Sequence, residues 1–266
     1  MPTAFDPGYA EEPFRTLVAS YPGTAAYPAA GFRLEWGPVF HRGRLDGTAR
    51  VLVIGQDPAQ HETIARRILV GEAGHRLQGF LFKLGIDRSY VMVNTFLYSV
   101  YGSASKNAEA TRIATYRGKW LDAIFAHEPI EAVVALGTLA DKAWQKWSAA
   151  RNPPVAYQRI THPTAPESAA GRNQGNHAAL ITKMLANWNG GLEALSPAIA
   201  HPDKKRKLVP YGTSFADGEK KPIPIGDLPA GSPQWMATDD GWADRAGTGR
   251  RRPVITVTVP KEARPS

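Results

Sequence analysis

Short runs of β-branched residues alternate with longer helical stretches through most of this chain. Four runs predict strands, at residues 50–55, 90–96, 130–137 and 155–166. A stretch with helical spacing follows each of them, at residues 71–85, 111–129, 138–148 and 173–191. Because parallel strands need long crossover connections, this order predicts an α/β fold: a three-layer α/β/α sandwich around a central, mainly parallel four-stranded sheet.

The composition changes after Leu195. Residues 196–266 hold 10 of the 22 prolines, 7 of the 25 glycines, and 12 Lys and Arg against 8 Asp and Glu. Such a segment predicts a basic, mostly irregular extension. Trp235, Trp242 and the alternating run at 254–260 nevertheless need a surface to pack on. We therefore predict a main domain over residues 1–195 and a Pro/Gly-rich extension over 196–266 that packs on this domain or edges it.

Composition also excludes several classes of protein. The 266 residues contain no cysteine, so disulfides, thiolate zinc sites, cysteine nucleophiles and cysteine-bound iron–sulfur clusters are excluded. No run approaches the roughly 20 apolar residues of a membrane span, and the N-terminal residues do not form a signal peptide. We expect a cytoplasmic protein without membrane contact. The formal net charge of +8 favours a polyanionic partner such as nucleic acid.

Three of the four predicted strands end in polar residues able to do chemistry. The first is followed by "GQDPA" with Asp57, the second ends in "NTF" with Asn94, and the fourth continues into "THPT" with His162. Each residue also has a structural interpretation: Asp-Pro forms turns, asparagine caps backbone groups, and a loop histidine is often merely hydrogen-bonded. Because ligands bind beyond the carboxyl ends of parallel strands, the three together predict a site.

These motifs, in this order, resemble the uracil-DNA glycosylase superfamily. "GQDP" resembles the first motif of the uracil-specific first family, and "ILVGEAGHRLQGFLFKLGID" resembles a helix start of the thermostable branch. "VNTF" and "THPT" resemble the second and third motifs, and the likeness covers roughly residues 50–188. The resemblance implies catalytic roles for Asp57 and His162. It implies that the flipped base is bound by Gln56, Ala59, Leu69 and Asn94.

The chain departs from the family pattern at several positions. Ala59 stands where the first family has a tyrosine beside uracil C5, and Leu69 stands at the position of the stacking aromatic residue. Pro166 aligns with the leucine wedge, and the cysteine ligands of the thermostable branch are missing. We therefore expect an atypical member in which Thr164, Pro166 and Arg172 contact DNA. Other basic residues that could contact phosphates are Arg66, Arg67, Lys106 and Arg112.

The expected activity is that of a monofunctional uracil-DNA glycosylase, acting as a monomer on DNA that contains uracil, without cofactor or metal. Two alternatives stay open. One is a glycosylase for another damaged base, since the wall beside C5 is altered at Ala59. The other is a non-catalytic nucleic-acid-binding module on the same fold. Asp57 distinguishes a glycosylase of either kind from a binding module, because a glycosylase needs a carboxylate beside the attacking water and a binding module does not.

Overall fold

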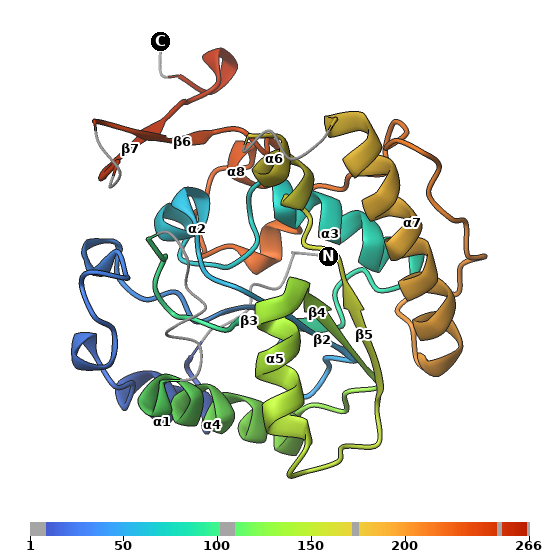
Figure 1. The fold of residues 1–266 in the computed structure, drawn as a ribbon, viewed down its shortest axis with the longest axis horizontal. Helices are drawn as coiled ribbons and strands as arrows, with labels where there is room; N and C mark the ends of the chain where they lie inside the picture. Colours follow the sequence, from blue (N-terminus) through green and yellow to red (C-terminus); the bar gives the residue numbers. More distant parts are fainter. Residues whose placement is uncertain (1–8, 102–109, 172–175, 249–251, 265–266) are drawn as a thin grey trace.

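The computed structural model describes residues 9–101, 110–171, 176–248 and 252–264. At its centre lies a five-stranded sheet with the strand order β1-β3-β2-β4-β5 (Figure 1). The strands are β1 (His41–Gly43), β2 (Val51–Gly55), β3 (Tyr90–Asn94), β4 (Ala132–Leu136) and β5 (Ala156–Ile160). β2 to β5 are parallel, and β1 runs antiparallel to β3. The predicted α/β fold is confirmed, with one strand more than the four expected.

Strand β1 escaped prediction because its sequence, "HRG", is short and lacks β-branched residues. All three residues are buried nonetheless. Arg42 is fully buried because Asp227, far along the chain, pairs with it at 3.1 Å between Nη1 and Oδ2. Tertiary contacts, and not local preference, therefore define this strand.

Helices cover both faces of the sheet and complete the three layers (Figure 1). The helices on one face are α1 (Phe14–Ala19), α4 (Thr111–His127) and α5 (Gly137–Ser148), and those on the other are α3 (Glu72–Lys83) and α7 (His177–Leu195). Three short helices are α2 (Gln60–Ala65), α6 (Ala165–Ala170) and α8 (Trp235–Thr238). The 3₁₀ turns are η1 (Thr24–Ala26), η2 (Leu34–Trp36), η4 (Ser196–Ala198), η5 (Ile225–Asp227) and η6 (Lys261–Ala263).

The central strands are buried on both faces, which explains their continuous apolar sequences. Successive side chains of a strand point to opposite faces. In β2, Leu52 and Ile54 pack with α1, α4 and α5, whereas Val51 and Val53 pack with α3 and α7. The same alternation in β3 and β4 gives the molecule two hydrophobic cores, one on each side of the sheet.

The described part of the C-terminal segment packs against the α3 side of the molecule. Tyr211 belongs to the core under α3 and α7, and Trp242 is buried in a third cluster with Val70. The segment then forms a two-stranded antiparallel hairpin of β6 (Ala243–Ala246) and β7 (Val254–Val257). This hairpin lies beside α2, at the same edge of the molecule as α6 (Figure 1). Among the described residues, no helix is long and apolar enough to cross a membrane.

Candidate active site

The carboxyl ends of the four parallel strands lie at one edge of the sheet. Gly55 pairs with Asn94 across β2 and β3, and Leu136 pairs with Ile160 across β4 and β5. The residues at or just beyond these ends are Gln56, Asp57, Asn94, Gly137 and His162. The parallel register therefore brings the three motifs of the sequence to one edge of the sheet, where the ends of β2 and β3 are neighbours and β4 separates β2 from β5.

Asp57 is held by a hydrogen bond to each of its carboxylate oxygens. The side-chain amide of Gln56 donates to Oδ1 at 2.9 Å, and the backbone N–H of Val100 donates to Oδ2 at 3.0 Å. Burial raises the pKa of Asp57 to about 6, although these two hydrogen bonds act in the opposite direction. The result is an oriented carboxylate that is mainly ionised at neutral pH and can accept a proton.

Glu62 fixes the loop that carries Asp57, a role that sequence reasoning missed. Its carboxylate accepts from the backbone N–H of Ala59 at 2.9 Å and from that of Val70 at 3.3 Å. It thereby joins the start of α2 to the segment before α3. The signal was half present: a glutamate at the third position of a helix completes a capping box, but Ala59 lacks the Ser or Thr side chain that makes the motif visible.

Asn94 ends β3 with its amide packed against the backbone of β2. A Cβ atom on Gly55 would lie 2.3 Å from Oδ1 of Asn94, so only glycine leaves room for this amide. The loops after the two strands are also joined, because Thr95 N–H donates to the carbonyl of Gly55 and Phe96 N–H to that of Gln56, both at 2.9 Å. The position of Asn94 therefore depends on the loop of Asp57.

Leu69 lies beside Gly55 and Asn94 in a strained backbone conformation. Its φ of 54° is in the left-handed region, which a leucine rarely adopts, and its side chain is 6% exposed. Cδ1 is 3.8 Å from the position of a Cβ on Gly55, and its carbonyl oxygen would be 1.7 Å from a Cβ on Gly74. Gly74, the second glycine of the "VGEAG" motif, thus permits the tight turn that sets Leu69 against the end of β2. Backbone strain of this kind is concentrated at functional sites.

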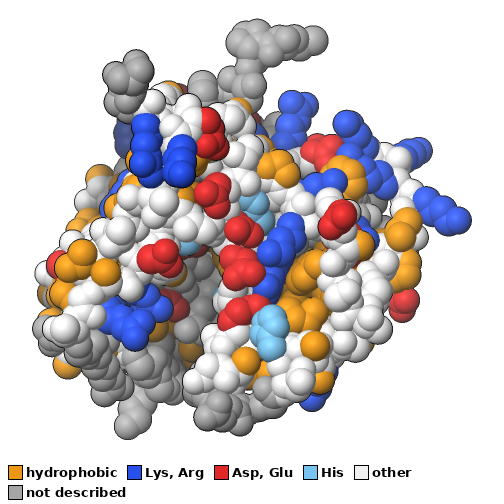
Figure 2. All heavy atoms as spheres, turned by 90° about the horizontal axis from the view of Figure 1, so that it is seen from above, with side chains coloured by type: hydrophobic (Ala, Val, Ile, Leu, Met, Phe, Trp, Pro, Cys, Tyr) orange, Lys and Arg blue, Asp and Glu red, His pale blue; other side chains and the backbone are white. Residues whose placement is uncertain are grey.

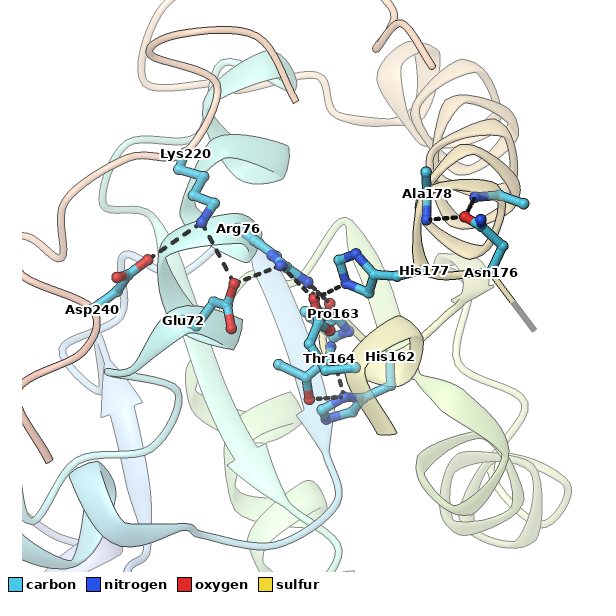
Figure 3. A network of polar contacts seen from close by, with 12 residues as sticks. Glu72, Arg76, His162, Pro163, Thr164, Asn176, His177, Ala178, Lys220 and Asp240 are labelled. Carbon is cyan, nitrogen blue, oxygen red and sulfur yellow. Dashed lines mark hydrogen bonds and ion pairs between the residues drawn. The ribbon is translucent and has the colours of Figure 1, made fainter. Parts of the chain in front are cut away.

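His162 is held as a neutral ring with a defined tautomer. The backbone N–H of Thr164 donates to Nδ1 at 3.3 Å, so Nδ1 is the acceptor and Nε2 carries the proton (Figure 3). Burial lowers the pKa of His162 to about 4. Cβ of His162 also lies 3.5 Å from the position of a Cβ on Gly137, the first residue of α5, and the positive end of that helix further disfavours an imidazolium.

The residues predicted to contact DNA have varied environments. Thr164 precedes α6, and Pro166 is buried in its first turn. Arg172 lies outside the described residues, as does Lys106. Arg66 donates to the carbonyls of Trp36 and Pro38, and Arg67 is largely buried, whereas Arg112 is exposed.

The β6–β7 hairpin forms a rim beside Asp57. The indole N–H of Trp36 donates to the carbonyl of Pro253 at 3.3 Å, and Arg33 Nη1 donates to that of Arg252 at 3.5 Å. At the other end, the backbone N–H of Ala243 donates to His61 in α2. The exposed Arg245 of β6 is close enough to lower the pKa of Asp57, against the larger effect of burial.

The surface above this edge carries charges of both signs. Asp and Glu side chains gather near its centre, with Lys and Arg side chains on both sides (Figure 2). Within the part of the chain that the structure describes, no three His, Asp or Glu side chains are grouped so that they could hold a metal ion.

A carboxylate, an amide and a neutral imidazole therefore lie at strand ends along one edge of an α/β/α sandwich, where a DNA glycosylase site was predicted. A comparison with protein families agrees: the family described as the Uracil DNA glycosylase superfamily matches residues 42–189, more than half of the chain. The chain belongs to the uracil DNA glycosylase superfamily, as its motifs predicted, and is thus a glycosylase that acts on DNA. A search of curated proteins gives no match.

Proposed function

We propose that the chain is a monofunctional uracil-DNA glycosylase, which hydrolyses the N-glycosidic bond of a flipped uracil and leaves an abasic site. One observation carries this proposal. Asp57 and His162 lie at the same edge of the sheet, and burial shifts their pKa values in opposite directions. The raised pKa makes the Asp57 carboxylate a better proton acceptor, and the lowered pKa keeps the His162 imidazole neutral. Asn94 is the last residue of β3, with its amide against Gly55 of β2, and we assign it the reading of the base edge.

Asp57 serves the sugar side of the reaction. Cleavage passes through an oxocarbenium-like sugar and an anionic base, so a nearby carboxylate stabilises the sugar cation. Each Asp57 oxygen accepts one hydrogen bond within the protein and keeps lone pairs for a water molecule. As the water oxygen bonds to C1′ and the bond from C1′ to uracil N1 breaks, Asp57 takes the water proton. The bonding electrons leave with the base.

His162 and Asn94 serve the base side. Thr164 occupies Nδ1 of His162, so the Nε2–H group donates to uracil O2, where negative charge develops. The Asn94 amide donates to O4 and accepts from N3–H, and cytosine reverses this pattern at both atoms. Leu69 gives the base a flat apolar contact. Thr164, Pro166 and Arg172 contact the DNA on either side of the flipped nucleotide, with Pro166 or Arg172 as the wedge.

The deciding experiment incubates the protein with oligonucleotides that contain uracil, hypoxanthine or only normal bases, and then treats them with alkali. We expect strand cleavage of the uracil substrate only after alkali, since an abasic site is the product. Cleavage before alkali would overturn the monofunctional assignment. Release of hypoxanthine alone would identify a glycosylase for another base, and binding without any release would identify a non-catalytic module.

Ala59 favours a second candidate, a glycosylase that also accepts 5-substituted uracils. A methyl group in place of a tyrosine ring opens space beside C5, and even a well-built pocket rejects one extra methyl by only about 1 to 3 kcal/mol. The ring of the neighbouring His61 packs edge-on against Trp242 in the C-terminal segment. We therefore do not expect His61 to fill the space beside C5.

Substitution of Ala59→Tyr tests this candidate. We expect the parent protein to release 5-fluorouracil and 5-hydroxymethyluracil as well as uracil, and Ala59→Tyr to restrict release to uracil. Rejection of every 5-substituted base by the parent would contradict the open pocket.

A further inference from the structure

Arg76 of α3 binds both the loop after His162 and the helix α6 that follows this loop. Its side chain is 5% exposed, and Nη1 donates to the carbonyl of Pro163 at 2.6 Å (Figure 3). The same guanidinium holds both carboxylate oxygens of Glu167, at 2.7 and 3.1 Å, and Nη2 donates to Glu72 at 2.5 Å. One cation thus connects α3 with both the catalytic loop and α6.

Residues from other parts of the chain enclose this cluster. Phe215 lies over the guanidinium at 5.3 Å, and Lys220 Nζ lies 3.5 Å from both Glu72 and Asp240. His177, at the start of α7, contacts Glu167 at 3.0 Å (Figure 3). Burial raises the pKa of Glu167, but the hydrogen bonds from Arg76 and His177 outweigh it and bring this pKa to about 2. Glu167, the partner of Arg76, is therefore ionised at neutral pH.

The tautomer of His162 depends on how its loop is held. Nδ1 receives the backbone N–H of Thr164, two residues on, and Ala165 N–H donates to the His162 carbonyl at 2.9 Å. The peptide between these groups is that of Pro163, whose carbonyl is the one that Arg76 binds. A movement of this carbonyl would rotate the Thr164 N–H away from the imidazole.

We propose that Arg76 is a positioning residue, which holds the Pro163 carbonyl and Glu167 so that His162 presents Nε2–H to the substrate. This inference rests on the proposed role of His162 as hydrogen-bond donor to the base. Arginine suits the task because its planar fork can bind two oxygens of a carboxylate and a carbonyl at fixed angles, which a lysine ammonium cannot do. Arg76 does not serve DNA, since its side chain is buried and its terminal nitrogens are already engaged.

Kinetics in two backgrounds test the proposal. Arg76→Lys should lower the single-turnover rate of uracil release at saturating DNA by about 10- to 100-fold, the usual effect of a small misplacement, with DNA affinity unchanged. In a His162→Ala background the same substitution should change the rate less than about twofold, because its target is gone. Arg151→Lys is the matched control, since Arg151 also pairs with a carboxylate, that of Asp122 in α4. Arg151 follows the C-terminal end of α5, which is the end away from His162.

A second measurement does not need activity, so it separates this proposal from the proposed function. The ¹⁵N shifts of the His162 ring at pH 7 should show a single Nε2–H tautomer in the parent and a mixture in Arg76→Lys. If Arg76→Lys does not fold, Glu167→Gln weakens the same clamp and should move both readouts in the same direction. Unchanged rate and shifts, or an equal loss of rate with and without His162, would overturn the positioning role.

Discussion

Asp57 is half-buried, in an environment that suits the proposed reaction and costs stability. Its pKa is raised by burial to about 6 from an ordinary value near 3.8, so the folded protein holds this proton more tightly than the unfolded chain. The stability that comes from the neutral carboxyl is complete below the unfolded pKa and is lost as the pH rises through about 6. In the proposed mechanism, activity should have the opposite dependence, because only the ionised form accepts the proton of water.

Asp57→Asn should therefore lower activity and raise stability at the same time. We expect single-turnover uracil release to fall by about 10²- to 10⁴-fold, and the parent's inflection near pH 6 to vanish from the rate profile. At pH 8 the free energy of unfolding should rise by about 1 to 3 kcal/mol, a gain that disappears as the pH falls toward 4. Urea denaturation at both pH values measures the gain, and an unchanged rate would remove Asp57 from the mechanism.

Gly55 leaves room for the Asn94 amide, to which we assign recognition of the base. Because a Cβ at this position would lie 2.3 Å from Asn94 Oδ1, Gly55→Ala should displace the amide and reduce uracil release by about 10²-fold. Gly190→Ala in α7 is the control, since apart from the adjoining backbone of α7 no described atom lies within 4 Å of a Cβ there. Crystallography or NMR of the variant locates Asn94. Full activity of Gly55→Ala would show that the amide has no role in recognition.

Sequence patterns predicted the elements whose information is local. Strands β2, β3 and β4 are apolar runs ended by polar residues, and α3, α4 and α7 have helical spacing, so these appeared where expected. The predicted fourth strand, 155–166, is instead a five-residue strand, a loop and the start of α6. Strand β1 and helix α2 are three and six residues long, too short for a periodic signal.

The same division applies to the site. Asp57, Asn94 and His162 were predicted because each ends or closely follows a recognisable strand, and the parallel strands place them at one edge of the sheet; their roles stay predictions. Arg76 was not predicted, because its partners Pro163 and Glu167 are 87 and 91 residues away along the chain. Contacts of this range are decided by tertiary packing, about which a local pattern holds no information.

The β6–β7 hairpin places positive charge at the rim of the site. Pro253 is bound to Trp36 and Ala243 to His61 of α2, and the exposed Arg245 is close enough to lower the pKa of Asp57. Arg245→Glu should weaken DNA binding and reduce the salt dependence of log Kd by about one unit, the effect of losing one phosphate contact. Lys183→Glu, the same charge change on the exposed face of α7, is the control. Equal effects of the two variants would indicate only a change in net charge.

At the scale of the whole molecule, the C-terminal segment is part of the hydrophobic core. Its composition predicted a basic extension that packs on the main domain or edges it, but could not reveal the buried charges that hold its described part. Asp227 is 0% exposed and pairs with the equally buried Arg42 at 3.1 Å and with Arg44 at 3.2 Å. Asp203 accepts the backbone N–H groups of Asp87, Arg88 and Ser89 before β3.

Loss of the Arg42–Asp227 pair should consequently destabilise the entire fold. Asp227→Asn leaves Arg42 without a charge partner in the interior, and removal of one member of a buried pair costs about 3 to 5 kcal/mol. Asp217→Asn, an exposed carboxylate of the same segment, should change the free energy of unfolding by less than about 0.5 kcal/mol. A chain that ends at Leu195 should lack a cooperative urea transition, since it also loses Tyr211 from the core. Cooperative unfolding of that shortened chain with normal uracil release would instead establish residues 1–195 as an independent catalytic domain.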